Sequence, residues 1–214
     1  DRLESGEPRV DRLIEADAAT RSGRWRAPLD GTNAFELAGK TVGLLGMGNI
    51  GRQVAKRLLA FDAAVRYHDI QRLSDGEERA LGLTYVETED LFRTSDLVSV
   101  HVPLVPATRH LVSRELLGLM KPNAVIVNTA RGGLIDETAL IEALQDGSVA
   151  GAGLDVFETE PVKPDNPLLK MPQVIATPHS AGTNWDAWSR RAAFGYANIA
   201  RVHSGEPPLG LISV

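Results

Sequence analysis

The stretch that most constrains the fold is TVGLLGMGNIG at Thr41–Gly51. Its opening residues, Thr41–Leu45, are mostly apolar, as in a strand that is buried on both faces of a parallel sheet. Glycines then fill every glycine position of a G-x-G-x-x-G pattern, and Ile50, Val54 and Leu58 recur with the spacing of one face of a helix. A strand, a glycine turn and a helix in this order are typical of a dinucleotide-binding unit.

Each glycine of this pattern has a separate physical role. Gly46 permits a tight turn, Gly48 lets a pyrophosphate approach the backbone, and Gly51 lets the helix pack closely on the strand. Free N–H groups and the positive end of the helix dipole then hold the phosphates. The alternative interpretation is an ordinary glycine-rich turn between a strand and a helix, and the flanking strand and helix favour nucleotide binding.

Composition excludes several classes of function. The chain has 214 residues and a net charge of −5, so its overall field does not favour nucleic acid as a partner. It contains no cysteine, which excludes disulfides, thiolate catalysis and cysteine-bound metals. No apolar run approaches the roughly 18 residues that cross a membrane, and no signal-peptide pattern opens the chain. We therefore expect a cytoplasmic protein without a metal, a membrane partner or a nucleic-acid partner.

Strand patterns alternate with helix patterns along the chain. This order predicts the α/β class, with a Rossmann-type, doubly wound parallel sheet and helices on both of its faces. Strands are expected at 41–45, 63–68, 83–86, 97–100, 124–128, 149–156 and 173–176, with helices at 74–80, 88–94, 113–120, 137–145 and 184–203.

The whole chain, 1–214, is predicted to be one dinucleotide-binding domain. It comprises a leading helix and arm at 1–28, a Rossmann core at 29–183, and a C-terminal helix and tail at 184–214. Trp25, in the arm, is expected to pack against another surface.

Asp69 lies 18 residues after Gly51, at the predicted end of the second strand. A carboxylate there accepts hydrogen bonds from the adenosine ribose and repels a 2′-phosphate, which favours NAD over NADP. Arg72 is close enough in sequence to meet such a phosphate instead. The alternative role for Asp69 is that of a turn-forming residue at the end of a strand.

Ligands of such sheets bind beyond the carboxyl ends of the strands, where His101, Arg131, Glu160 and His179 are expected. The guanidinium of Arg131 suits a carboxylate, and the glycines that follow it leave room for a small substrate. Glu160 and His179 flank a proline-rich loop, so the carboxylate can orient the imidazole and raise its pKa. The alternatives are a surface ion pair for Arg131 and a structural role for His179.

Several ordered motifs together resemble one known family, the D-isomer-specific 2-hydroxyacid dehydrogenases, which include D-3-phosphoglycerate dehydrogenases and glyoxylate/hydroxypyruvate reductases. The motifs are Gly23-Arg24-Trp25, Leu44–Gly51 (LLGMGNIG), His101-Val102-Pro103-Leu104 with Thr108, Asn128-Thr129-Ala130-Arg131-Gly132, Gly153–Pro161 (GLDVFETEP) and Thr177-Pro178-His179. Separate motifs in the same order are far more specific than any one of them.

The resemblance implies an NAD-dependent oxidoreductase that acts on a small D-2-hydroxy acid or the matching 2-keto acid. Arg131 would bind the substrate carboxylate and carbonyl oxygen, Glu160 rather than Glu158 would tune the histidine, and His179 would be the general acid/base. The residues that would bind NAD are Gly46, Gly48, Asn49, Ile50, Gly51, Asp69, His101, Val102, Pro103, Thr108, Thr129, Ala130, Arg131, Asp155, His179 and Gly182.

The chain departs from the family pattern at two places. Pro178-His179-Ser180-Ala181-Gly182 has Ser-Ala-Gly where many relatives have Ile-Gly-Gly. His179 and the final glycine are kept, which implies a local adjustment only. Members also carry a substrate domain of roughly a hundred residues ahead of this one, and we expect that domain to be largely absent from this chain. The family further implies a homodimer. The alternative function is an NAD(H)-sensing, corepressor-like interaction module without significant turnover.

Overall fold

The computed structural model describes residues 12–24 and 35–211. The expectation for Trp25 lies outside these residues. The chain divides into two compact units, Asp1–Pro178 and His179–Val214, and each is described by itself. The domain boundaries predicted from the sequence remain predictions.

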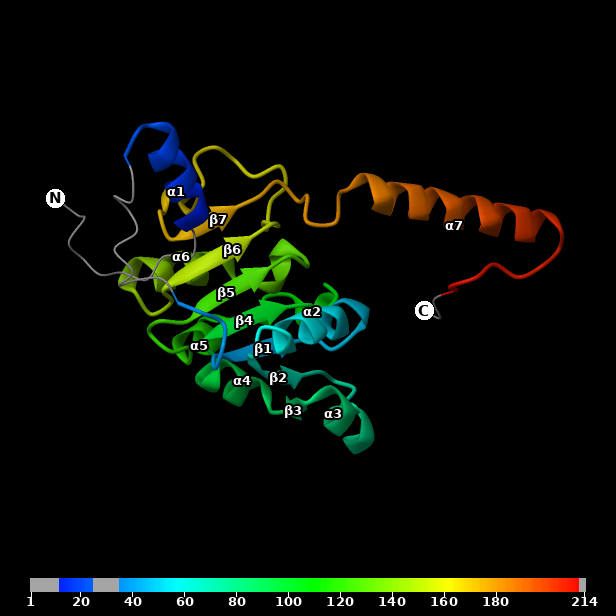
Figure 1. Cartoon of the computed structure of the whole chain (residues 1–214), viewed down its shortest axis with the longest axis horizontal. Helices are drawn as coiled ribbons and strands as arrows, with labels where there is room; N and C mark the ends of the chain where they lie inside the picture. The colour runs from blue at the N-terminus through cyan, green and yellow to red at the C-terminus, as the bar shows by residue number, and fades with distance from the viewer. Residues whose placement is uncertain (1–11, 25–34, 212–214) are drawn as a thin grey trace. The chain divides into compact units, whose positions relative to one another are not determined.

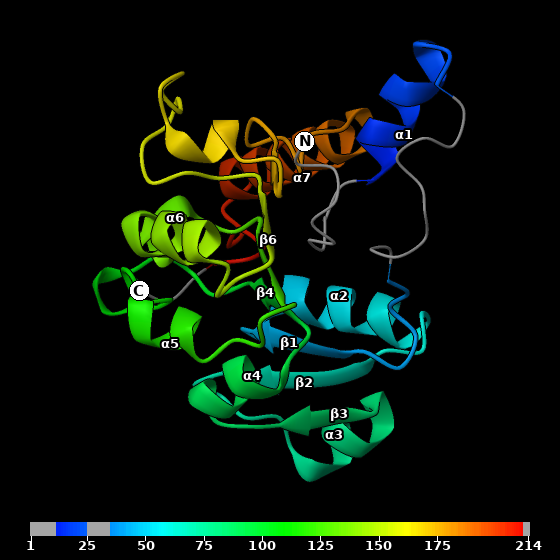
Figure 2. The same cartoon turned by 90° about the vertical axis from the view of Figure 1, so that its left-hand side faces the viewer.

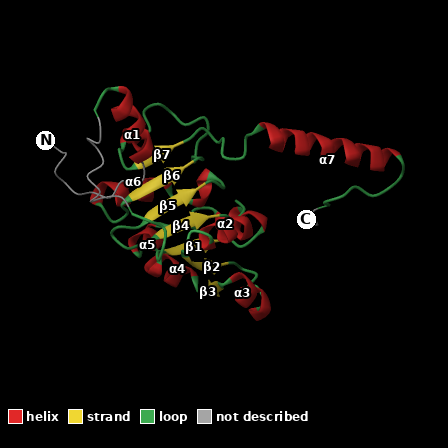
Figure 3. Cartoon of the chain, in the orientation of Figure 1, coloured by secondary structure: helices red, strands yellow, loops and turns green. Residues whose placement is uncertain are grey.

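The first unit is built on a seven-stranded parallel sheet with the order β3-β2-β1-β4-β5-β6-β7 (Figures 1 and 3). Its connections cross from strand to strand as in a doubly wound fold, so the predicted fold class is confirmed. The strands are β1 (Thr41–Leu45), β2 (Ala64–His68), β3 (Leu83–Tyr85), β4 (Leu97–Val100), β5 (Val125–Asn128), β6 (Gly151–Leu154) and β7 (Val174–Ala176).

Helices lie on both faces of this sheet. Figure 2 shows α4, α5 and α6 on one side of the strands and α2 on the other. The helices of the first unit are α1 (Arg12–Arg21), α2 (Asn49–Leu59), α3 (Asp75–Leu81), α4 (Thr88–Thr94), α5 (Arg114–Gly118) and α6 (Glu137–Asp146), with short 3₁₀ turns at Pro106–Thr108, Gly132–Leu134 and Pro167–Lys170.

Strand β1 contributes to two hydrophobic cores because its side chains alternate between the two faces of the sheet. Val42 and Leu44 pack in the core on the α2 side, whereas Leu45 packs in the core that includes Phe92 of α4 and Leu140 of α6. All of these side chains are almost completely buried. Burial on both faces explains the continuous apolar run that the sequence shows at β1.

The helix after the glycine turn buries its small residues most deeply. Ile50 is 66% exposed, and Val54 and Leu58 are only partly buried. The fully buried residues of α2 are Gly51 and Ala55. These small residues allow the helix backbone to approach the sheet closely, while Val54 and Leu58 also pack against the core on this side.

The second unit contains α7 (Trp185–His203), which begins one residue after the predicted start and ends at the predicted residue. Asn184 caps the helix, because its side chain accepts a hydrogen bond from the backbone N–H of Ala187 (2.8 Å). Trp185 is 84% exposed and no residue of α7 is buried. Within the described ranges, no helix is both long and apolar enough to cross a membrane.

Candidate functional site

The strand register brings several of the predicted site residues to one edge of the sheet. Leu45 pairs with His68 on one side and Val100 on the other, and the same row continues through Asn128, Leu154 and Ala176. The residue that follows each of these positions therefore leaves the sheet at the same level. These residues are Gly46, Asp69, His101, Thr129, Asp155 and Thr177.

The glycine turn after β1 has the geometry that its pattern predicts. Gly46 has a φ of +105°, and a Cβ there would lie 2.8 Å from the backbone of His101 and Val102. A Cβ at Gly51 would lie 2.2 Å from the carbonyl oxygen of Gly46, which confirms the close packing of helix and turn. A Cβ at Gly48 would meet nothing within 4 Å, so the backbone there faces open space.

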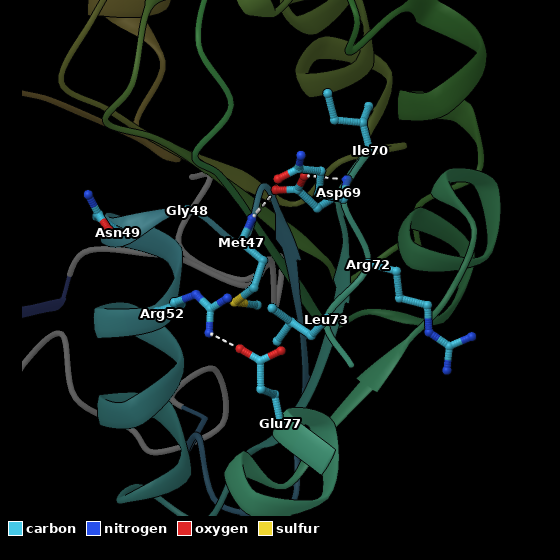
Figure 4. A pocket seen from close by; sticks show the side chains of 10 residues that line it. Met47, Gly48, Asn49, Arg52, Asp69, Ile70, Arg72, Leu73 and Glu77 are labelled. Atoms are coloured by element: carbon cyan, nitrogen blue, oxygen red, sulfur yellow. Dashed lines mark hydrogen bonds and ion pairs between the residues drawn. The ribbon is translucent and has the colours of Figure 1, made fainter. Parts of the chain in front are cut away.

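The open space beside Gly48 belongs to a cavity of about 480 Å³ between the glycine turn and the end of β2 (Figure 4). Asp69 lines this cavity, and its carboxylate accepts hydrogen bonds from the backbone N–H groups of Met47 (2.6 Å) and Gln71 (2.9 Å). Asp69 therefore ties the glycine turn to the end of β2. The turn-forming role and a ribose-binding role are compatible, because each carboxylate oxygen can accept more than one hydrogen bond.

Arg72 also lines the cavity but is directed away from Asp69 (Figure 4). Its guanidinium forms a bidentate pair with Glu78 of α3, with Nε–Oε1 and Nη2–Oε2 distances of 2.8 and 3.0 Å. The sequence left open whether Arg72 faces a bound phosphate. In this structure, it binds a carboxylate instead.

The loop after β4 is fixed by hydrogen bonds from Thr108. Its hydroxyl donates to the carbonyl oxygen of Pro103 (2.7 Å) and accepts from the N–H of Val105 (2.8 Å). His101 lies at the start of the loop, 2.9 Å from the hydroxyl of buried Ser99 (Nε2–Oγ), and burial lowers the pKa of this imidazole. A neutral His101 at pH 7 follows, which suits a wall of the site better than a proton donor.

Asn128, at the end of β5, shapes the loop that carries Arg131. It is buried, its Oδ1 accepts from the N–H of Ala130 (3.0 Å), and its Nδ2 donates to the carbonyl oxygen of Arg131 (2.9 Å). Asn128 is not among the site residues predicted from the sequence. A buried asparagine at a strand end, just before a turn, is the signal that points to such a role.

Gly132 brings the loop after β5 into direct contact with the loop after β6. A Cβ at Gly132 would lie only 1.9 Å from the backbone carbonyl carbon and oxygen of Phe157, so no side chain fits there. Arg131 therefore lies beside the segment that contains Glu160, whose Oε1 accepts a hydrogen bond from the N–H of Phe157 (3.0 Å). The contact explains why a glycine has to follow the arginine.

The two glutamates of this segment have different partners. Glu158 pairs with the imidazole of His110 and lies 3.8 Å from the guanidinium of Arg109. Glu160 precedes Pro161 through a cis peptide bond and closes the turn described above. The engagement of Glu158 elsewhere supports the assignment of the histidine-tuning role to Glu160, which remains a prediction.

Asp155 follows β6 and is 4% exposed. Its backbone N–H donates to the carbonyl oxygen of Asn128 (3.0 Å), and its Oδ1 accepts from the hydroxyl of Thr177 (2.5 Å). Thr177 belongs to the motif Thr177-Pro178-His179, but it is not among the site residues predicted from the sequence. It now explains how a nearly buried carboxylate is held in one orientation.

His179 and Gly182 belong to the second unit. His179 has a φ of +52°, and the N–H of Thr183 donates to the carbonyl oxygen of Ser180 (2.8 Å), which closes a turn just after it. The pairing of His179 with Glu160 remains a prediction. Among residues 12–24 and 35–211, no group of three or more His, Asp or Glu side chains could hold a metal ion.

The doubly wound sheet, the glycine turn and the cavity beside it define a Rossmann-type dinucleotide-binding protein. Residues 9–181 match the family described as "D-isomer specific 2-hydroxyacid dehydrogenase, NAD binding domain". The chain belongs to this family, as its sequence motifs predict.

Curated relatives cover most of the chain. It is 42% identical over 204 residues to a glyoxylate reductase of Thermofilum pendens, covering 94% of this chain and 60% of the relative. It is 43% identical over 196 residues to a D-3-phosphoglycerate dehydrogenase of Methanocaldococcus jannaschii, covering 91% and 36%. The chain therefore spans less than two thirds of the length of these relatives.

Solved structures give the same result. The apo form of Rhodotorula graminis D-mandelate dehydrogenase has a TM-score of 0.86 and 34% identity, covering 95% of this chain and 61% of that one. The D-lactate dehydrogenase of Lactobacillus jensenii with NAD⁺ has a TM-score of 0.80 and 30% identity, covering 94% and 63%. The family and these neighbours identify NAD as the cofactor of the fold.

Proposed function

We propose that this chain is the NAD-binding part of an oxidoreductase that transfers a hydride between NAD(H) and a small D-2-hydroxy acid or 2-keto acid. The observation that carries the proposal is the single row of strand ends, from which the glycine turn, Asp69 and the Arg131 loop all leave the sheet. One edge thus offers groups for a pyrophosphate, a ribose and a carboxylate.

The residues present fit a dinucleotide. Helix α2 begins at Asn49 with Gly48 as its cap, and no side chain caps its first N–H groups, which leaves them directed at the open space beside Gly48. Asn49 and Ile50 would donate to the pyrophosphate, while Asp69 would accept from the ribose hydroxyls. Thr129, Ala130 and Asp155 would hold the nicotinamide end, with His101, Val102, Pro103 and Thr108 forming the wall between the two.

The substrate would be held and protonated by residues of this chain. Arg131 would bind the carboxylate and the keto oxygen, since a planar guanidinium suits two oxygens at once. Glu160 would accept from the imidazole of His179 and raise its pKa, so that His179 can donate a proton to the keto oxygen. Bound NADH supplies the hydride.

The substrate class follows from the family, and the named relatives indicate which acids to test first. A full-length form that includes a substrate domain would be assayed with glyoxylate, hydroxypyruvate, pyruvate and phosphohydroxypyruvate, using NADH and NADPH. Turnover of one of these acids would support the proposal. NADH-dependent partner binding without turnover would instead favour the interaction module.

Cofactor binding is tested on the 214-residue chain by titration with NADH, followed by nicotinamide fluorescence and calorimetry. We expect saturable binding, and no binding at millimolar NADH would contradict the proposal. We also propose a cytoplasmic homodimer that takes no nucleic acid or membrane as a partner. Sedimentation equilibrium of the full-length form checks the dimer.

A further inference from the structure

Helix α3 contributes Glu77 to the lining of the cavity beside Gly48, yet no residue of α3 is buried. Polar contacts hold the helix in place. Ser74 and Glu77 form a reciprocal capping box at its start. Glu77 also forms an ion pair with Arg52 of α2 (3.2 Å, Figure 4), and Glu78 binds Arg72. Two consecutive carboxylates of α3 thus each hold an arginine that lines the cavity.

Glu78 is held more firmly than an ordinary surface carboxylate. Its side chain is only 12% exposed, and its Oε1 accepts a hydrogen bond from the hydroxyl of Tyr67 (2.7 Å). Tyr67 is completely buried in β2, and its hydroxyl also accepts from the N–H of Leu73 (2.9 Å). The position of Glu78 is therefore set by a core residue of the sheet.

Several contacts hold Arg72 against Glu78. The bidentate pair uses its Nε and Nη2, its guanidinium lies 5.0 Å from the centre of the Tyr85 ring, and Asp75 lies 3.7 Å from Nη2. These contacts keep the cation on the side of the loop that faces α3. Tyr67 and Glu78 thus connect Arg72 to the core of the sheet.

Two residues that line the cavity therefore favour different cofactors. Asp69 repels a 2′-phosphate, whereas an arginine just beyond the end of β2 is the group that accommodates one. Arg72 is such an arginine, and a guanidinium binds phosphate bidentately when it is free to do so. Which preference prevails depends on whether Arg72 can reach the ribose.

We propose that Glu78 is a specificity-determining residue, which makes the site select NADH over NADPH by holding Arg72 away from the ribose 2′ position. The inference rests on the proposed function, since it concerns the same cofactor site. Glu78 itself is a positioning residue that acts through Arg72. Asp69 alone does not account for the selection, because a released Arg72 would offset its charge.

The test is fluorescence titration of the 214-residue chain with NADH and with NADPH. In Glu78→Gln we expect the affinity for NADPH to rise about tenfold and the affinity for NADH to change less than twofold. Adding Arg72→Ala to Glu78→Gln should return the NADPH/NADH ratio to that of the unaltered chain. Glu142→Gln is the matched control, because it removes a glutamate that pairs with Arg114 elsewhere on the surface.

Several outcomes overturn the inference. A ratio unchanged in Glu78→Gln, with NADH binding retained, would show that Glu78 does not control selection. A gain that persists in the double variant would assign the effect to the lost negative charge rather than to Arg72.

Arg72→Ala alone keeps the Tyr67–Glu78 contact and remains informative if Glu78→Gln does not fold. It should leave the NADPH/NADH ratio unchanged, and a loss of NADPH affinity would show that Arg72 already reaches the phosphate. Absence of NADH binding by the unaltered chain would overturn the proposed function and this inference with it.

Discussion

The Asp69 carboxylate is already engaged within the chain before any nucleotide binds. It accepts from the N–H groups of Met47 and Gln71, so the group that would bind a ribose also fixes the glycine turn. A residue with both roles is oriented in advance, which lowers the entropy lost when a ligand binds. Removing the side chain therefore affects the shape of the site as well as its contacts.

We predict that Asp69→Ala weakens NADH binding by about tenfold or more, since hydrogen bonds to a charged group are worth about 1.5–3 kcal/mol. Titration calorimetry measures the change. Asp165→Ala, which removes an exposed aspartate from a distant loop, is the control and should leave the affinity unchanged. An unaltered affinity in Asp69→Ala would contradict the ribose assignment.

Among the glycines of the site loops, Gly132 leaves the least room for a side chain. Because a Cβ there would overlap the backbone of Phe157, we predict that Gly132→Ala lowers the free energy of unfolding by about 2 kcal/mol. Urea denaturation measures the change. Gly118→Ala is the matched control, since a Cβ at that helical position meets nothing within 4 Å. Equal stability of the two variants would show that the loops can separate without loss.

Among the secondary-structure elements, those with strong local signals were predicted well from the sequence. Thr88–Thr94 and Leu97–Val100 have the same bounds in the structure as in the prediction, and α6 begins at the predicted residue, Glu137. The strand predicted at 149–156 is shorter in the structure, Gly151–Leu154. Val149 and Val156 are also buried, but they lie outside the residues of β6 that pair in register with β5.

Contacts between elements were not predictable in the same way. The burial of Gly51 and Ala55 of α2, and the hydrogen bond between Tyr67 and Glu78, depend on distances between segments. The sequence pattern does not encode these distances. Asn128 and Thr177 were visible only as parts of motifs. Their partners, the Arg131 loop and Asp155, became identifiable only once the strand register was known.

Helix α3 is held by charged groups, so its attachment depends on pH. Hydrogen bonds from Arg72, and then from the hydroxyl of Tyr67, hold the pKa of Glu78 at about 2, with Arg79 adding a smaller attraction. The pKa of a glutamate in an unfolded chain is about 4.3. The pair thus contributes stability above about pH 4.3, and the contribution is lost as the pH falls toward 2.

We predict that Glu78→Gln is less stable than the unaltered chain at pH 7 and that the difference shrinks as the pH falls from about 5 to 3. Urea denaturation at a series of pH values follows it. Glu89→Gln, which removes an exposed glutamate of α4, should show a smaller and flatter difference. A difference for Glu78→Gln that stays constant down to pH 3 would contradict the role of the ionised carboxylate.

At the scale of the whole molecule, cofactor binding and the proposed hydride transfer are tested on different lengths of chain. The relatives are longer, and the chain spans about 60% of the glyoxylate reductase of Thermofilum pendens. Cofactor binding is therefore the property to measure on the chain, and turnover is the property to measure on a full-length form. This division keeps a failure of binding separate from a failure of catalysis.

We predict that His179→Ala in a full-length form lowers kcat by about 10²–10⁴-fold, because general acid catalysis contributes that much. The KM for NADH should rise far less than kcat falls, since the proton is transferred to the substrate rather than to the cofactor. Steady-state kinetics separates the two parameters. An unchanged kcat would rule out the general-acid assignment.

Because the strands end at a common level, an inserted residue has different effects in a loop and within a strand. A residue inserted in a loop beyond the row formed by His68, Leu45, Val100, Asn128 and Leu154 lengthens that loop and leaves the other strand ends in place. A residue inserted within a strand moves every later side chain of that strand to the opposite face and displaces its last residue from the row. We therefore expect insertions and deletions to be accepted in the loops beyond this row and to be destabilising within the strands.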